Sequence, residues 1–339
     1  MTMTSSTPLR PPGPHAGAPP LIGAPPGDPG PWAAAHRDDV RTALAGHGAL
    51  LVRGLDLGTP DEVAAVAEGL GAVPAPEREA LAARRTHREG VYSSATWPPH
   101  QRMCMHHESS YTLDRPGLLL IACLTAPDEG GETGTADAAA VLAALPGALV
   151  RRFEAEGWVL DRSYHEDIGA GVADAFGTDD RAAVEAYCRA QAVDFAWGDD
   201  GGLRTRQRRA AVVRHPADGR RCWSNQVAFL SEWTLDPDVR EYLTDVYGAD
   251  ALPFTTRYGD GEPIEEETVR QIEAVYADHT ALHRWRAGDL LLVDNLRTAH
   301  SREPYEGPRD VVVAMADPVR VPASGAAEPA FGPVGAGPS

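Results

Sequence analysis

The chain has little cysteine and no long apolar run. Its 339 residues include four cysteines, which form neither a CxxC pair nor a dense framework, so we expect reduced thiols in a cytoplasmic protein. No apolar run approaches the ~18–20 residues that span a bilayer, and the run at residues 118–124 suits a buried strand. The first thirty residues lack the charged and apolar regions of a secretory signal, so none is expected.

Basic residues are also scarce. Lys and Arg number 31 against 49 Asp and Glu, which gives a net charge of −18. Proteins that bind nucleic acid normally carry a basic surface, so we expect no nucleic-acid partner, and no membrane partner either. The patterns GxGxxG, GxxxxGK[ST] and GxSxG are absent too, so no motif supports a doubly wound sheet.

Proline and glycine mark the ends of the predicted domain. Residues 1–30 are rich in both and cannot sustain a helix or a strand ladder, so we predict a disordered lead-in with ordered structure from near Trp32. Residues 321–339 have a similar composition and are predicted to be a flexible tail. Residues 31–320 then form a single domain, long enough to bury a substantial core.

Within this domain, short apolar runs broken by Gly/Pro turns occur with groups of helices. This pattern favours a mainly β fold with inserted helices (α+β), specifically a jelly roll, over a doubly wound sheet. Thr59, Pro60 and Glu62 predict a helix start with a capping box. An amphipathic helix is predicted over 265–285, and a β-hairpin over 212–227.

The stretch His106-His107-Glu108 carries the clearest chemistry. In an extended strand, residues i and i+2 share a face, so His106 and Glu108 would point the same way. One imidazole and one carboxylate are two thirds of a facial triad, in which two His and one carboxylate hold iron(II) and leave positions open. His300, after a predicted buried strand at 290–293, is the best candidate for the third ligand. A closed antiparallel β-architecture can bring these distant segments together.

Other interpretations of these residues stay open. A lone His-x-Glu is a weak signal, and His106 could equally be a surface or packed core histidine. His107 is a rival ligand, although on a strand it would face away from Glu108. Cys104 shares the strand face of His106 and is expected to pack rather than to bind metal.

An iron site of this kind needs an electron source. If the co-substrate is 2-oxoglutarate, its distal carboxylate needs a fixed cation. Arg309 enters the last predicted strand shortly after His300, and a planar guanidinium can meet a carboxylate through two parallel hydrogen bonds. A surface arginine on a strand is the alternative.

These segments fall in the order and spacing of the taurine dioxygenase-like (TauD/TfdA) superfamily, which the chain resembles over roughly residues 32–318. The resemblance is carried by His106-His107-Glu108, Gly130-Gly131-Glu132-Thr133, Gly288-Asp289, Asp294-Asn295, His300 and Glu306-Gly307-Pro308-Arg309.

The resemblance implies an iron(II)- and 2-oxoglutarate-dependent oxygenase that consumes O2, on a double-stranded β-helix. It is nearest to the clavaminate synthase-like members, which use Glu as the carboxylate ligand. His106, Glu108 and His300 then match the iron ligands, and Thr133 and Arg309 match the groups that hold the distal carboxylate of 2-oxoglutarate. Glu108 argues against halogenation, because related halogenases have a small residue at that position.

The resemblance further implies oxidation of an unactivated C–H bond, most simply hydroxylation, with release of succinate and CO2. The expected substrate is an amino acid or its derivative, free or carrier-bound, in bacterial natural-product biosynthesis. Desaturation, epoxidation and cyclisation are alternatives within the family. Candidate substrate contacts are Ser110 and Tyr111, after the metal stretch, and Asn225 and Gln226, on a strand that could face the mouth.

An arginine cluster stands out against the acidic background. Such a run is usually a solvated face, but it could also be the landing site of an acidic carrier protein that delivers a tethered amino acid. The cluster comprises Arg204, Arg206, Arg208, Arg209, Arg214, Arg220 and Arg221.

Two other function classes compete with the oxygenase. The same three residues could hold zinc on a cupin-like barrel, for hydrolysis or isomerisation. That hypothesis leaves Thr133 and Arg309 without a role. A non-catalytic β-sandwich binding module with fortuitous histidines would predict no iron binding at all.

Overall fold

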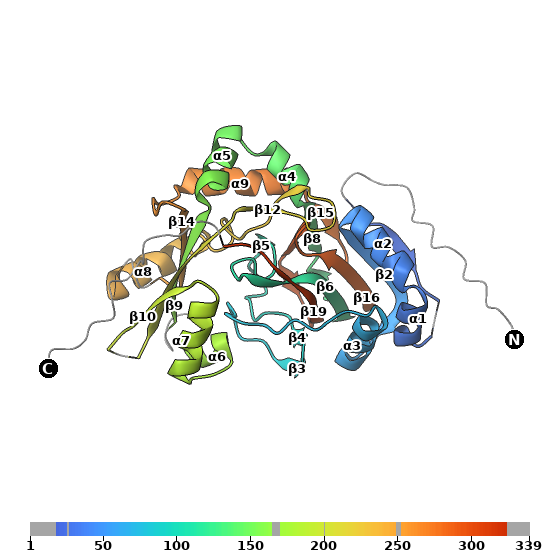
Figure 1. Cartoon of the computed structure of the whole chain (residues 1–339). Coiled ribbons are helices and arrows are strands. Elements are labelled where there is room, and N and C mark those ends of the chain that lie inside the picture. Colours follow the sequence, from blue (N-terminus) through green and yellow to red (C-terminus); the bar gives the residue numbers. More distant parts are fainter. Residues whose placement is uncertain (1–17, 26, 165–169, 200, 249–251, 324–339) are drawn as a thin grey trace, which may run out of the picture.

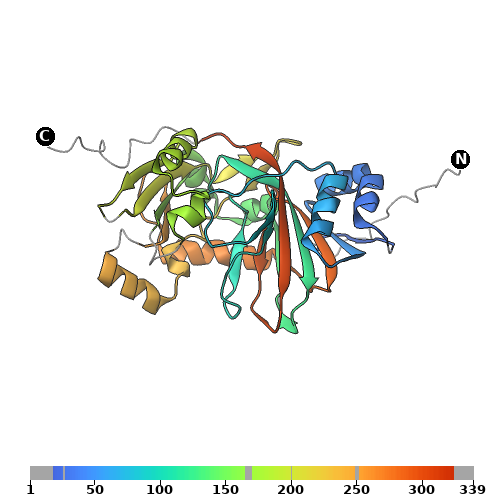
Figure 2. The same ribbon diagram turned by 90° about the horizontal axis from the view of Figure 1, so that it is seen from below.

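A computed structural model of the chain describes residues 18–25, 27–164, 170–199, 201–248 and 252–323. Figure 1 shows the strands β6, β16 and β19 near the middle of the molecule, with α1, α2 and α3 at one end. The strands β9, β10 and β14 lie toward the other end with α6, α7 and α8. Figure 2, turned by 90°, shows the same order from end to end. The fold is thus a mixture of β-sheets and helices.

The larger central sheet has seven strands and two apolar faces. Along β6, Leu118, Leu120 and Ala122 belong to one core, and the alternate residues Leu119 and Ile121 belong to another. Side chains alternate along a strand, so an unbroken apolar run predicts burial on both faces. In spatial order the strands are β1 (Leu21–Gly23), β2 (Ala49–Leu57), β16 (Gly288–Asp294), β6 (Asp114–Thr125), β19 (Asp310–Arg320), β4 (Val91–Ser93) and β3 (Thr86–Arg88).

Three helices cover one face of this sheet: α1 (Pro29–Ala35), α2 (Arg37–His47) and α3 (Pro60–Gly69). The predicted capping box of α3 is confirmed, because the Thr59 side chain accepts from the Glu62 amide and the Glu62 carboxylate accepts from the Thr59 amide. Ordered structure begins before Trp32, with β1 and the start of α1, which corrects the predicted lead-in over residues 18–25 and 27–30. β1 pairs in parallel with β2, and this long-range pairing cannot be seen in local composition. Residues 1–17 and 324–339 lie outside the described residues, as do the corresponding parts of the predicted lead-in and tail.

A smaller central sheet carries most of the residues predicted for the site. Its order is β15 (Ala281–His283), β8 (Thr133–Asp137), β17 (Thr298–Arg302) and β5 (Met103–His106), and all of its pairings are antiparallel. Its register places His300 opposite His106 on one side and opposite Thr135 on the other. Segments that are far apart in the chain therefore meet at neighbouring positions of one sheet.

The remaining elements surround these two sheets. The predicted hairpin is present as β12 (Val212–Arg214) paired with β13 (Arg221–Trp223), but its second strand ends at Trp223 and does not continue to residue 227. The helix predicted over 265–285 is shorter, since α9 covers Glu266–Asp278 and the following residues form β15 at the edge of the smaller sheet. The others are α4 (Ala138–Ala144), α5 (Gly147–Glu156), β9 (Trp158–Tyr164), α6 (Val172–Phe176), α7 (Arg181–Ala190), β10 (Asp194–Trp197), β11 (Leu203–Arg209), η1 (Glu232–Thr234), α8 (Pro237–Tyr247), β14 (Phe254–Tyr258) and the pair β7 (Glu129–Gly130) and β18 (Tyr305–Glu306).

None of the described helices has the length and apolarity that a membrane crossing requires. The four cysteines are free thiols, as expected. The cytoplasmic location stays a prediction.

Candidate active site

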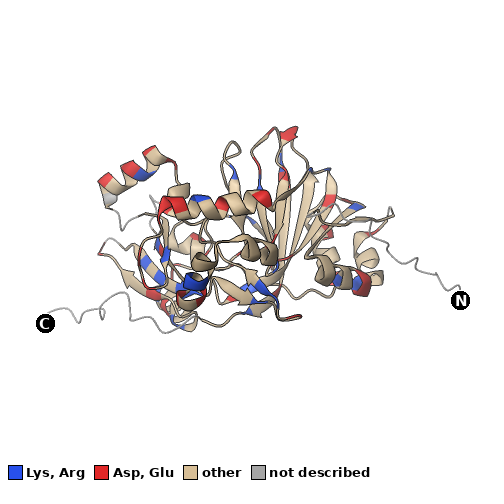
Figure 3. Cartoon of the chain, turned by 90° about the horizontal axis from the view of Figure 1, so that it is seen from above, with Lys and Arg blue, Asp and Glu red and all other residues tan. Residues whose placement is uncertain are grey.

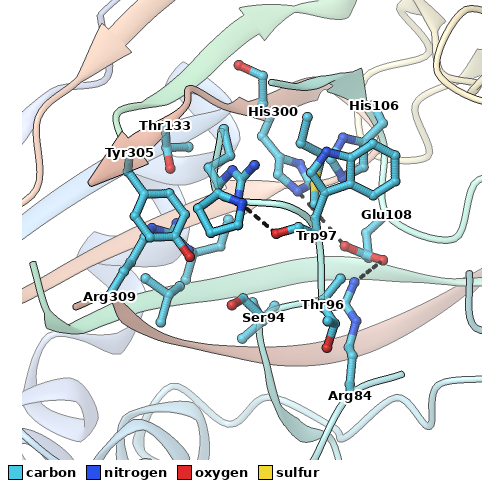
Figure 4. A pocket seen from close by; sticks show the side chains of 18 residues that line it. Arg84, Ser94, Thr96, Trp97, His106, Glu108, Thr133, His300, Tyr305 and Arg309 are labelled. Carbon is cyan, nitrogen blue, oxygen red and sulfur yellow. Dashed lines mark hydrogen bonds and ion pairs between the residues drawn. The ribbon is translucent and has the colours of Figure 1, made fainter. Parts of the chain in front are cut away.

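His106, Glu108 and His300 converge although they come from distant segments. His106 is the last residue of β5, and His300 is its cross-strand partner in β17, with ring centroids 4.3 Å apart. The Glu108 Oε2 atom lies 3.9 Å from His300 Nε2. One ligand atom from each residue lies within 4.8 Å of the others, so a single metal ion can reach all three (Figure 4).

The turn that carries Glu108 differs from the expected strand. β5 ends at His106, and residues 108–111 form a turn in which Ser109 has φ of +51°. This left-handed backbone is uncommon for residues other than glycine. The turn, and not the pleat of a strand, therefore aims Glu108 at the space between the two histidines.

Asn295 fastens this turn to the loop before β17. Its Oδ1 accepts from the Glu108 amide at 2.8 Å, and its Nδ2 donates to the Glu108 carbonyl at 2.9 Å. The same Nδ2 donates to the Pro116 carbonyl at 2.8 Å, at the start of β6. Asn295 is fully buried, and replacing it would leave these backbone groups without partners. Each buried group left unpaired would lower the stability of the fold by about 1–3 kcal/mol. Asn295 thus fixes Glu108 relative to His300.

The two histidines are buried in the form that binds metal. Burial lowers the pKa of His106 and of His300 below the usual value, so both rings are neutral near pH 7. The Nδ1 of His106 lies 2.8 Å from the Cys104 carbonyl, which can only accept. Nδ1 therefore carries the hydrogen, and Nε2 keeps a lone pair for a metal. The ring of His106 also stacks on Phe229, with centroids 4.7 Å apart.

His107, the rival ligand, turns into the protein. Its Nδ1 lies 2.7 Å from the Asn295 carbonyl and its Nε2 lies 3.0 Å from the Trp223 carbonyl. Each ring nitrogen thus lies against a backbone carbonyl, one of which accepts the ring N–H, and His107 is absent from the set of converging ligand atoms. His107 therefore has a structural role next to the site.

Arg84 is a member of the site that the sequence did not reveal. Its Nη2 donates to Glu108 Oε1 at 2.9 Å, and its Nε lies 3.0 Å from Glu77 Oε1. Burial lowers the pKa of Arg84, but the two carboxylates outweigh it and hold that pKa above the usual value. The segment around Arg84 is irregular and rich in arginine, so no periodicity distinguishes this residue from its neighbours.

Thr133 and Arg309 lie away from Glu108 and Arg84, on the other side of the cavity (Figure 4). Arg309 has no ion pair within the described part of the chain, and its buried Nε has no hydrogen-bond partner there. Burial, with a contribution from Arg302, lowers its pKa to about 10, so the guanidinium remains charged at neutral pH. The Thr133 oxygen accepts from Trp285 Nε1 at 3.0 Å, which leaves the hydroxyl hydrogen free to donate. Thr133 and Arg309 line the same cavity, so a half-buried guanidinium without an ion pair among the described residues and a hydroxyl that can donate are both available to a carboxylate there.

A cavity of about 360 Å³ joins the triad to this cationic end. One wall comes from β5, β8 and β17 of the smaller sheet. The opposite wall comes from Ile121, Val311 and Val313 of the larger sheet. This apolar wall keeps water from part of the site and strengthens the charge interactions inside it.

The rest of the wall is a segment that the sequence analysis did not assign to the site. Ser94, Thr96 and Trp97 line the cavity. Arg302 holds this segment from β17 by donating to the carbonyls of Trp97, Pro98 and Gln101, the Pro98 contact being 2.8 Å. Arg302 is only 7% exposed, so these contacts are shielded from water.

The four predicted substrate contacts do not line this cavity. Gln226 donates to the His107 carbonyl at 2.6 Å, Asn225 to the Ala211 carbonyl at 2.8 Å, and Tyr111 to the Glu79 carbonyl at 2.9 Å. Ser110 is fully buried. Asn225 and Gln226 also lie beyond β13 and not on a strand. Asn225, Gln226 and Tyr111 therefore hydrogen-bond to the backbone behind the metal turn and do not reach into the cavity.

The arginine cluster is largely bound within the chain. Arg206 pairs with Asp161, Arg220 with Asp218, and Arg221 with Glu154, each at 2.5 Å. Arg209 is buried and donates to backbone carbonyls, among them that of Tyr111 at 2.6 Å. Figure 3 shows basic and acidic positions interspersed over the described chain. The structure therefore offers little support for a continuous basic docking face.

Two neutral imidazoles and one carboxylate with open positions are typical of non-haem iron oxygenases. Comparison with known proteins agrees. The family model "Taurine catabolism dioxygenase TauD, TfdA family" matches residues 6–315. The chain therefore belongs to the TauD/TfdA family, as the sequence motifs predicted. It is an iron(II)- and 2-oxoglutarate-dependent dioxygenase, and not a zinc enzyme on a cupin-like barrel or a non-catalytic binding module.

Two individual proteins are also similar to this chain in sequence. The dapdiamide synthesis protein DdaC of Enterobacter agglomerans is 33% identical over 276 residues, which cover 81% of this chain and 84% of that protein. A clavaminate synthase-like protein of Arabidopsis thaliana is 27% identical over 280 residues, 79% of this chain and 81% of its own length.

Solved structures resemble the chain in fold. PvcB of Pseudomonas aeruginosa has a TM-score of 0.54 at 16% identity and covers 93% of this chain and 95% of its own. A taurine dioxygenase from Burkholderia xenovorans has a TM-score of 0.51 at 15% identity, with 93% and 92% covered.

Proposed function

We propose that this dioxygenase oxidises an unactivated C–H bond, most simply by hydroxylation, in an amino acid or an amino-acid-derived substrate. Succinate and CO2 would be released in each turnover. The observation that carries the proposal is the cavity that joins three convergent metal ligands to Arg309, which has no ion pair among the described residues. The setting we propose is bacterial natural-product biosynthesis. The names of two similar proteins support it, one described as a dapdiamide synthesis protein and the other as an oxygenase from an isonitrile synthetic pathway.

In this proposal His106, Glu108 and His300 hold the iron. Thr133 and Arg309 hold the distal carboxylate of 2-oxoglutarate. When bound, iron and 2-oxoglutarate supply the oxidising chemistry with O2. The chain keeps both imidazoles neutral, holds the carboxylate in place, and shields the site with apolar side chains of β6 and β19.

The substrate is proposed to lie against the wall formed by Ser94, Thr96 and Trp97, close to Glu108. This wall has two hydroxyl groups and one large aromatic face, and Met103 adds further apolar surface. A small substrate with polar groups and an apolar chain suits such a lining. Desaturation, epoxidation and cyclisation remain alternatives, because they depend on where the substrate is held relative to the iron.

We also propose that the two central sheets are the two halves of a double-stranded β-helix. Both sheets contribute side chains to the lining of the cavity, which is what a site between the two halves of a jelly roll requires. The fold-level likeness to PvcB and to a taurine dioxygenase supports this assignment.

The experiment is succinate formation by anaerobically iron-loaded protein, given O2, 2-oxoglutarate and a panel of free amino acids. We expect iron-dependent succinate that one panel member increases and that is lost in His106→Ala and in Arg309→Ala. Arg320→Ala is a matched control, because Arg320 is an exposed arginine at the far end of β19. Binding of iron and 2-oxoglutarate without turnover would point to a larger or carrier-bound substrate. Absence of both binding events would refute the assigned residues.

A further inference from the structure

The two oxygens of Glu108 have different neighbours. Oε2 lies on the side of His300, 3.9 Å from its Nε2. Oε1 instead accepts a hydrogen bond from Arg84 Nη2 at 2.9 Å. A carboxylate can bind a metal through one oxygen or through both. In this arrangement Oε1 is already hydrogen-bonded to the Arg84 guanidinium.

Arg84 is itself held in place. Its Nε lies 3.0 Å from Glu77 Oε1, so the guanidinium bridges two carboxylates. The side chains of Arg84, Glu108 and Glu77 are only 9%, 9% and 12% exposed, and water therefore screens these charges weakly. The Glu77 amide donates to the Tyr92 hydroxyl at 2.9 Å, which ties this segment to β4 of the larger sheet.

We propose that Arg84 is the positioning residue of the metal site. It holds Glu108 through Oε1 so that only Oε2 is presented to the metal, and Glu77 anchors Arg84 for this task. This inference rests on the proposed role of Glu108 as an iron ligand. Its consequence is that the coordination positions needed for 2-oxoglutarate and O2 stay open, because Glu108 cannot occupy a second one.

The test measures metal and co-substrate binding, not turnover alone. In Arg84→Met, we expect affinity for iron(II), measured anaerobically by calorimetry, to fall by roughly 10- to 100-fold, the range seen when a partner of a metal ligand is removed. At saturating iron, affinity for 2-oxoglutarate should also fall, by roughly tenfold or more, as Glu108 becomes free to use both oxygens. The visible absorption of the iron–2-oxoglutarate chelate reports the same change.

Matched variants separate positioning from general damage. Arg85→Met removes the neighbouring arginine, whose side chain is exposed, and should leave both affinities unchanged. Arg84→Lys keeps the charge but loses the planar fork, so it should restore only part of the iron affinity. Glu77→Gln releases the anchor and should weaken iron binding several-fold. Thermal unfolding of the metal-free proteins shows whether Arg84→Met folds. If it does not fold, Glu77→Gln still tests the proposal.

The outcomes distinguish this inference from the proposed function. If Arg84→Met and Glu77→Gln bind iron and 2-oxoglutarate as tightly as the unmodified chain, Arg84 has no positioning role. If the unmodified chain itself binds neither, the proposed ligand set fails first. If iron affinity falls equally in Arg84→Met and Arg85→Met, the effect is one of general charge, and the inference is overturned.

Discussion

His106 and His300 are directly opposed across two antiparallel strands. β17 is paired with β5 on one side and with β8 on the other, so His300 faces both His106 and Thr135 in register. The side-chain period of a strand is two residues, and a slip of one position would turn His300 out of the site. Strand register, and not nearness in the sequence, therefore assembles the two imidazoles.

The first prediction separates His106 from its neighbour His107. His106→Ala should reduce affinity for iron(II) by more than 100-fold, because it removes a ligand and not merely a partner of one. His107→Gln should largely keep that affinity but lower the free energy of unfolding by about 1–3 kcal/mol, since its ring contacts two buried carbonyls. Calorimetric iron titration and urea unfolding of both variants provide the measurement. A reversed pattern would identify His107 as the ligand.

The second prediction concerns Arg309. Arg309→Met should weaken 2-oxoglutarate binding by roughly 100-fold or more, because it leaves a buried carboxylate without its cation. Iron affinity should be unchanged, since Arg309 lies at the other side of the cavity from Glu108. Binding is measured by titrating 2-oxoglutarate into metal-loaded protein, with Arg320→Met as the exposed control at the far end of the strand that follows Arg309. Unaltered co-substrate binding would show that another group holds the distal carboxylate.

The third prediction concerns the wall that Arg302 holds. Arg302→Met should free the carbonyls of Trp97, Pro98 and Gln101, each of which loses a charged donor. Such a bond contributes about 1.5–3 kcal/mol. Amide hydrogen exchange at Gln101 should therefore be roughly tenfold faster or more. Arg102→Met is the control, because the Arg102–Glu303 pair is partly exposed and contributes little. Equal exchange in both variants would mean that Arg302 does not fix the wall.

The fourth prediction is a pH effect on stability. Burial, with a contribution from Arg53, lowers the pKa of His283 to about 4, whereas an unfolded histidine titrates near 6.5. Between these values the unfolded chain binds a proton that the folded chain does not, so the free energy of unfolding falls as the pH is lowered. Metal-free protein should lose about 2 kcal/mol more between pH 7 and pH 5 than His283→Gln does.

Urea unfolding at both pH values measures this difference. His100→Gln, which removes an exposed histidine, should behave like the unmodified chain. If His283→Gln loses as much stability as the unmodified chain, His283 titrates normally in the folded state.

Predictions that depend on interactions between residues close together in the chain agree with the structure. The capping box at Thr59 and the hairpin around residues 212–223 depend on neighbours a few residues away, and both are present. The helix expected to continue to 285 instead ends at Asp278, because β15 pairs with β8. The substrate contacts assigned to Asn225 and Gln226 were placed by assuming a strand beyond Trp223, and both side chains are bound by the backbone.

By itself, the sequence determined the family, the three candidate metal ligands and the candidate carboxylate-binding residues Thr133 and Arg309. These are motif residues whose chemical type and order along the chain are enough to recognise them. Only the tertiary structure decided that a turn and not a strand aims Glu108, that Asn295 clamps this turn, and that Arg84 and Arg302 belong to the site. The reason is physical: these contacts join segments that meet only after the sheets have formed, and an arginine has the same local pattern whether it faces solvent or a buried carboxylate.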